Sequence, residues 1–103
     1  MRFITSTREY LEIYNNNTKS EGDLFIFLKK KISEDILAVG IVVSKKVGKA
    51  VIRNKLKRRI KAFLRENINI HPTNEKIIII ARSVAGNAAW QEIKKDLTML
   101  FGT

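Results

Sequence analysis

The sequence predicts an α+β fold, an α/β sandwich in which helices pack on one mixed central sheet in the order α-β-β-α-β-α. Three segments have the alternating or continuous apolar residues that are typical of strands: 24–31, 36–44 and 77–81. Three others have apolar residues at helical spacing: 7–14, 49–67 and 88–101. The chain has 103 residues, of which 45% are hydrophobic, so we expect one folded domain over 1–103.

The first helix is short and aromatic. Tyr10 and Tyr14 lie one helical turn apart in 7–14, and the asparagines at 15–17 are expected to end the helix, since asparagine tolerates the left-handed conformation. A short extra strand fits near 18–22. The first two segments therefore predict a helix and a short extra strand before the main strands begin.

The strand at 24–31 alternates, so its side chains should divide between the two faces of the sheet. The two predicted sets are Leu24, Ile26 and Leu28 against Phe25, Phe27 and Lys29. The strand at 36–44 follows a turn, and the continuous apolar run at 77–81 is typical of a central strand buried on both faces.

The positive charge of the chain is concentrated in one stretch, residues 45–65. The whole chain has 20 Lys and Arg residues against 10 Asp and Glu, and ten of the basic residues and none of the acidic ones lie in this stretch. The formal net charge of +10 is therefore local, and the balance elsewhere is even. Such a stretch favours a polyanionic partner, RNA or DNA first and a membrane surface second.

Helical periodicity divides the basic stretch into two sides. The apolar side is formed by Ile52, Leu56, Ile60, Phe63 and Leu64. So small a domain needs this side for its core, which argues against a helix lying on a membrane surface. The other side has like charges at i,i+3 and i,i+4 spacing, which repel one another, so a merely solvated face is also disfavoured. Nucleic acid remains, with Asn54 as the one uncharged polar side chain on the exposed side.

The residues provide no catalytic or metal site. There is no cysteine, and His71 is the single histidine, so general acid-base chemistry by a histidine pair is excluded. Glu92 and Asp96 are four residues apart and are expected to support a helix surface rather than to hold a metal. The N-terminal residues have no apolar run of signal-peptide length, and the longest apolar run is too short to span a bilayer, so a cytoplasmic protein is expected.

The stretch from Val47 to Lys61 (VGKAVIRNKLKRRIK) resembles the signature of the bacterial ribonuclease P protein subunit. Its centre is the Arg-Asn-Lys box at 53–55, and Ser44-Lys45-Lys46 precedes it as in that family. The resemblance extends over nearly the whole chain, including the aromatic first helix and a last helix that begins at Trp90. It implies a left-handed β-α-β crossover through the basic helix, which the usual connection rule would not favour.

What the resemblance implies about function is specific. The family's protein binds a catalytic RNA, and that RNA, with Mg²⁺ that it holds itself, removes the 5′ leader of precursor tRNA. No catalytic residue, stably bound metal, membrane contact or protein oligomer is then expected of this chain. The residues expected to bind the catalytic RNA are Arg53, Asn54, Lys55, Lys57, Arg58, Arg59, Lys61 and Arg65.

The resemblance also implies an aromatic cleft for the single-stranded leader, between the first helix and the sheet. Tyr10, Tyr14 and Phe27 match its aromatic positions, and such rings can stack on unpaired bases without demanding a sequence. Lys45, Lys46 and Lys49 are expected to hold phosphates beside the cleft. The alternative function is a ribosomal-type or other basic RNA-binding module that is unrelated to tRNA processing.

Overall fold

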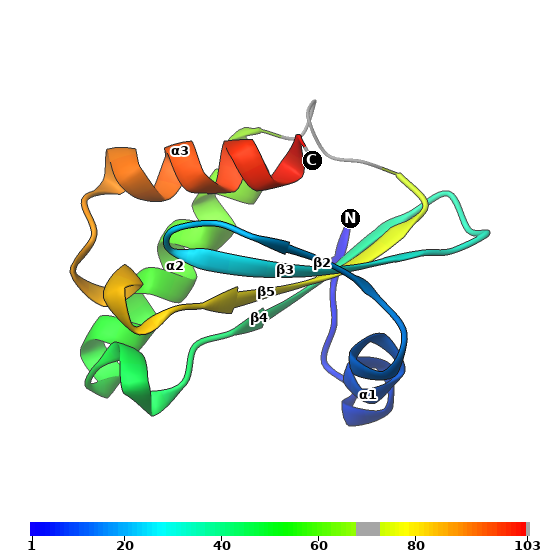
Figure 1. Ribbon diagram of the computed structural model, residues 1–103, viewed down its shortest axis with the longest axis horizontal. Coiled ribbons are helices and arrows are strands. Elements are labelled where there is room, and N and C mark those ends of the chain that lie inside the picture. Colours follow the sequence, from blue (N-terminus) through cyan, green and yellow to red (C-terminus); the bar gives the residue numbers. More distant parts are fainter. Residues whose placement is uncertain (68–72, 103) are drawn as a thin grey trace.

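The computed structural model describes residues 1–67 and 73–102. In this part of the chain, five strands form one mixed sheet in the order β1-β4-β5-β3-β2, with helices on both of its faces. The elements are β1 (Arg2–Phe3), α1 (Thr7–Asn15), β2 (Thr18–Glu21), β3 (Phe25–Lys31), β4 (Leu37–Val42), the 3₁₀ turn η1 (Lys45–Val47), α2 (Ala50–Glu66), β5 (Glu75–Ala81), the 3₁₀ turn η3 (Ser83–Asn87) and α3 (Trp90–Phe101). Figure 1 shows α3 above the sheet and α1 below it, with α2 passing behind the strands.

The α+β fold and the order of the six main elements are as the sequence predicts, and β2 is the short strand expected near 18–22. The two-residue strand β1 was not predicted. It pairs in parallel with β4, with Arg2 opposite Ala38 and Phe3 opposite Val39. The sequence also predicts a loop at 71–74, of which His71 and Pro72 lie outside the described residues. None of the helices in the described ranges is long and apolar enough to cross a membrane.

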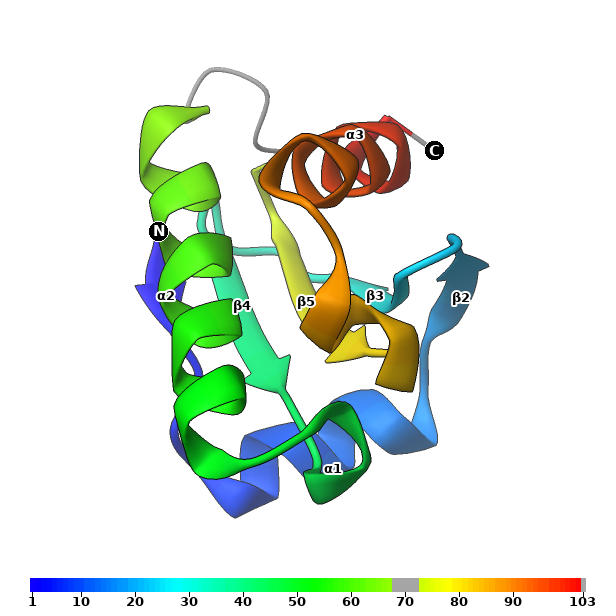
Figure 2. The ribbon, with the colours of Figure 1, turned by 90° about the vertical axis from the view of Figure 1, so that its left-hand side faces the viewer.

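The strand β5 is the centre of the sheet. It pairs antiparallel with β3 on one side and parallel with β4 on the other. The parallel pair is connected through α2, which is the expected β-α-β crossover. In Figure 2 both strands run towards the viewer, β5 lies to the right of β4, α3 lies above the sheet and α1 below it. Helix α2 packs on the same face as α3. This arrangement is the left-handed one.

Two hydrophobic clusters lie on the two faces of the sheet. The larger cluster packs against α2 and α3 and includes Phe25 and Phe27, and the smaller one packs against α1 around Ile13 and Leu28. From Phe25 to Leu28 successive side chains lie in opposite clusters, as the predicted alternation requires. Leu24, which was predicted to share a face with Ile26 and Leu28, precedes the strand and lies in the larger cluster, so its placement was wrong. On α2 the predicted apolar side is also confirmed, since Leu56, Ile60, Phe63 and Leu64 are buried and Ile52 packs against them.

Asp96 lies inside the structure and not on a helix surface, so the expectation for this residue was wrong. Its carboxylate accepts hydrogen bonds from the backbone N–H groups of Asp23, Leu24 and Phe25, at 3.0–3.1 Å. Gly22 makes this approach possible, since a Cβ atom there would lie 2.5 Å from Asp96 Oδ1. A buried carboxylate is tolerated when donors of this kind satisfy it. Asp96 therefore joins α3 to the turn between β2 and β3.

Candidate nucleic-acid interface

The exposed side of α2 carries the basic residues that the sequence predicts to bind RNA. Because the apolar side is held in the core, the opposite side must face solvent. We call this surface the basic face. It consists of Arg53, Asn54, Lys55, Lys57, Arg58, Arg59, Lys61 and Arg65, of which Asn54, Lys55, Arg58 and Arg65 are exposed and the other four are half-buried. The structure therefore brings all eight predicted residues onto one helix.

The cations of the basic face have no carboxylate partners among the described residues. The ion pairs in this part of the chain belong to other cations, namely Arg2, Lys19, Lys30, Lys76 and Arg82. Seven positive charges on one helix therefore repel one another without compensation. Such a surface attracts polyanions and is stabilised when their phosphates bind.

Two residues of the basic face also have structural contacts. Arg53 Nε donates a hydrogen bond to the carbonyl oxygen of Gly48, at 3.1 Å. Gly48 has a φ of 151°, a conformation that glycine adopts readily and other residues rarely do, and it turns the chain from η1 into α2. Lys61 Nζ lies 5.2 Å from the ring centroid of Phe3, within the range of a cation–π contact.

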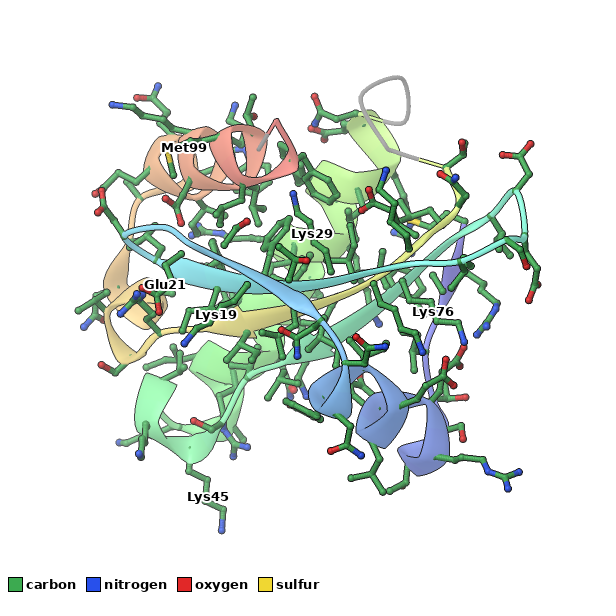
Figure 3. All side chains as sticks on the ribbon, turned by 45° about the vertical axis from the view of Figure 1, so that its right-hand side comes forward. Lys19, Glu21, Lys29, Lys45, Lys76 and Met99 are labelled. Atoms are coloured by element: carbon green, nitrogen blue, oxygen red, sulfur yellow. The ribbon has the colours of Figure 1, made fainter. Side chains whose placement is uncertain are left out.

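Lys45, Lys46 and Lys49 lie at and just after η1, and all three are exposed. The turn is fixed by its third residue, Val47, which is buried and packs against η3. The close contact requires a glycine at position 86 of η3, because a Cβ atom on that residue would lie 2.4 Å from the Val47 carbonyl oxygen. In Figure 3, Lys45 extends into solvent on the side of the sheet that carries α1.

Tyr10 and Tyr14 share one side of α1 but differ in exposure. Tyr14 is 44% exposed. Tyr10 is half-buried and lies directly over Gly40, where a Cβ atom would come within 2.7 Å of its ring. Burial raises the pKa of Tyr10, and a hydrogen bond from the backbone of Ile41 to its hydroxyl partly offsets that effect. Tyr10 is thus fixed on the sheet, and Tyr14 is open to a ligand.

Phe27 does not lie near the two tyrosines, so its assignment to the leader cleft was wrong. Its side chain has no exposed area and belongs to the cluster under α2 and α3. There it packs edge to face against Phe101, with ring centroids 4.9 Å apart. The apolar residues of β3 that face α1 are Ile26 and Leu28.

A hollow of about 210 Å³ at the β1 edge of the sheet connects Tyr10 with the basic face. Its lining comes from the N-terminal segment, α1, β4 and α2: Phe3, Ile4, Thr5, Tyr10, Val39, Ile41, Lys57 and Lys61. The two surfaces that the sequence predicts separately are therefore neighbours. Phe3 was missed because the Phe3-Ile4 pair is too short to give a periodic signal.

A network of ion pairs holds α1 on the sheet. Glu9 accepts hydrogen bonds from Arg2 of β1, one of them at 2.9 Å, and it pairs with Lys76 of β5 at 3.0 Å. Glu12, one turn later, pairs with Lys30 at 3.0 Å and with Lys76 at 3.4 Å. The hydrogen bonds from Arg2, and secondarily those from Lys76, lower the pKa of Glu9 to about 2. The network fixes the helix that carries both tyrosines.

This network should make stability depend on pH. Since the pKa of Glu9 is lowered from 4.5 to about 2, its carboxylate stabilises the fold fully above pH 4.5 and loses this contribution as the pH falls towards 2. Glu9→Gln should therefore lower the free energy of unfolding at neutral pH, and its difference from the wild type should vanish near pH 2. Urea unfolding at a series of pH values measures this. The matched control is Asp35→Asn, which removes an exposed carboxylate that forms no ion pair among the described residues. A Glu9→Gln difference that is constant with pH would contradict the prediction.

The fold and the basic face define a small nucleic-acid-binding protein of the α+β class. The family model described as "Ribonuclease P" matches residues 2–103. The "Ribonuclease P protein component" of Mycoplasma mycoides is 36% identical over 100 residues, which cover 96% of this chain and 92% of that protein. The solved structure of the Staphylococcus aureus RNase P protein superposes with a TM-score of 0.89 at 29% identity, over 97% of this chain and 92% of that one. The Thermotoga maritima RNase P protein gives 0.85 at 30% identity, over 91% and 89% of the two chains.

The chain belongs to the ribonuclease P protein family. It is thus an RNA-binding protein subunit of the ribonucleoprotein endonuclease that processes the 5′ ends of tRNA. Membership in this family implies association with the RNase P RNA, and the family uses Mg²⁺ in its RNA catalysis.

Proposed function

We propose that the basic face anchors the chain on the catalytic RNA and that Tyr10 and Tyr14 contact the single-stranded 5′ leader of precursor tRNA. Lys45, Lys46 and Lys49 would bind phosphates beside the tyrosines. In this arrangement the protein binds and orients the RNA strands, and the catalytic RNA cleaves the leader. The reaction class is hydrolysis of a phosphodiester bond, with no chemical step on this chain.

The observation that carries this proposal is the uncompensated charge of the basic face. Carboxylates pair with cations around α1 and β2, but none pairs with a described cation of α2. Counterion release on binding phosphates favours association with RNA at such a surface. The arginines add planar groups that can bind two phosphate oxygens at once.

The donor groups of the basic face do not fit a resident metal ion. Mg²⁺ prefers carboxylate and carbonyl oxygens, and this face offers ammonium and guanidinium groups with the single amide of Asn54. These cations repel a divalent metal. We therefore place Mg²⁺ on the RNA, where it would supply the charge stabilisation for cleavage.

Reconstitution with the catalytic RNA tests the proposal. At Mg²⁺ concentrations too low for the RNA alone, the protein should restore removal of the leader from precursor tRNA, because it adds positive charge where the strands meet. Cleavage is followed on labelled precursor tRNA. If the protein binds the RNA but does not restore cleavage, it would be a basic RNA-binding module unrelated to this reaction.

Tyr14→Ala should weaken binding of precursor tRNA to the assembled enzyme about tenfold, because one base-stacking contact of about 1–3 kcal/mol is lost. Binding of mature tRNA, which has no leader, should not change. The matched control is Leu11→Ala, since Leu11 is 55% exposed on the same helix. Equal effects of Tyr14→Ala on both tRNAs would place Tyr14 away from the leader.

A further inference from the structure

Beside the basic face, α2 and the start of α3 border a second, open hollow, which neither α1 nor the leader surface reaches. Its volume is about 420 Å³, and it is lined by Lys55, Arg58, Arg59, Ala62 and Trp90. The size is that of a small-ligand site. The lining consists of one aromatic ring, the small side chain of Ala62 and three cationic side chains.

Trp90 is placed here by the turn that leads into α3. The indole packs partly against the main core, and it remains half-buried at the rim. Lys94, one turn later on α3, holds its ammonium group 5.4 Å from the centroid of the ring and adds a further positive charge. Although Trp90 follows Lys55 by 35 positions in the chain, both residues line the hollow.

An adjoining hollow of about 280 Å³ extends this site along α2. It shares Lys55 and Arg59 with the first, and its other wall is η3 and the chain that follows it, including Gly86 and Asn87. The first hollow thus combines an indole ring with three cationic side chains, and the second lies between α2 and the η3 segment. Lys55 and Arg59 stand between the two.

We propose that these paired hollows hold one unpaired nucleotide of the bound RNA, with its base stacked on Trp90 and its phosphate between Lys55 and Arg59. Bases stack on indole rings irrespective of sequence, and lysine and arginine bind the phosphate. Charge complementarity selects an anionic occupant, because no carboxylate pairs with Lys55, Arg58 or Arg59 in the described part of the chain. This inference rests on the proposed contact of the basic face with the catalytic RNA.

Trp90 is the only tryptophan of the chain, so its fluorescence reports this site alone. The fluorescence is excited at a wavelength that tyrosine does not absorb. When the wild-type protein is saturated with the catalytic RNA, it should lose most of its tryptophan emission, because stacking on a base quenches indole fluorescence. Lys55→Ala with Arg59→Ala should retain most of the emission at saturating RNA. Lys31→Ala with Lys95→Ala, which removes the same charge from exposed positions outside α2, should be quenched as the wild type is.

The affinity for the catalytic RNA is a second measurement that tests the site. Trp90→Leu, which keeps an apolar side chain against the core, should weaken binding of the catalytic RNA at least fivefold, and Trp90→Phe should restore most of the loss, since a phenyl ring still stacks. Urea unfolding of the two variants should give similar midpoints, which separates loss of stacking from loss of packing.

The outcomes distinguish the two proposals. RNA that binds with unchanged tryptophan emission, or with equal affinity for wild type and Trp90→Leu, overturns the nucleotide site and leaves the proposed function standing. RNA that does not bind at all overturns the proposed function and this inference with it.

Discussion

Replacing Asp96 with alanine is expected to lower the free energy of unfolding by about 3–5 kcal/mol, because three backbone N–H groups lose their acceptor and each buried unsatisfied donor costs about 1–3 kcal/mol. The groups are those of Asp23, Leu24 and Phe25, and the last two lie in the interior. Urea unfolding followed by circular dichroism measures the loss.

Two variants control this prediction. Asp96→Asn can keep its amide oxygen in place of Oδ2, which accepts from both Leu24 and Phe25, so we expect a smaller loss of about 1–3 kcal/mol. Glu92→Ala removes a single exposed bond, from the Ala89 N–H to the Glu92 carboxylate, and should cost about 1 kcal/mol as a lost helix cap. If Asp96→Ala lowers the free energy of unfolding by less than Glu92→Ala does, water must replace the Asp96 carboxylate as the acceptor, and the prediction is wrong.

Arg58→Ala combined with Arg65→Ala is expected to weaken binding of the catalytic RNA by about 3 kcal/mol, more than a hundredfold, since two charge-assisted phosphate contacts are lost. The slope of log affinity against log salt should become shallower by about two units, one for each phosphate. Binding measured across a series of potassium chloride concentrations gives both numbers. These two arginines are chosen because their side chains are exposed, whereas Arg53 also holds the Gly48 carbonyl.

The matched control is again Lys31→Ala with Lys95→Ala, which removes equal charge from exposed positions outside α2. It should change the salt slope by less than half as much, because neither lysine belongs to the basic face. Equal slopes for the two double variants would mean that the net charge of the protein, and not the basic face, determines affinity.

Periodicity and, for the strand at 77–81, a continuous apolar run predicted the six main elements. Periodicity also predicted the two sides of α2, because its buried residues recur at helical spacing. The basic face followed directly, since a helix that buries one side exposes the other. Strand β1 could not be predicted, because two residues define no period. Its contact with β4 depends on tertiary structure.

The errors at the site have a physical reason too. Successive residues of a strand point to opposite faces of the sheet. The residue of β3 assigned to the cleft, Phe27, is therefore on the wrong face, whereas its neighbour Leu28 is on the face of α1. Asp96 was predicted to lie on the helix surface because it is four residues from Glu92. That spacing does not show which side of α3 packs on the β2–β3 turn. The hollow beside Trp90 joins segments far apart in the chain, and no local pattern indicates it.

The central position of β5 has a consequence for how the chain folds during synthesis. Strands β3 and β4 do not pair with each other, and each finds its inner neighbour only in β5. Until residues 75–81 have been made, the earlier part of the chain can form only the β1–β4 and β2–β3 pairs, and α2 has no complete sheet on which to bury its apolar side. Contacts between distant segments form slowly. The like-charged helix therefore becomes a fixed surface only when the last strand enters the sheet, so a nascent chain should acquire its affinity for RNA late.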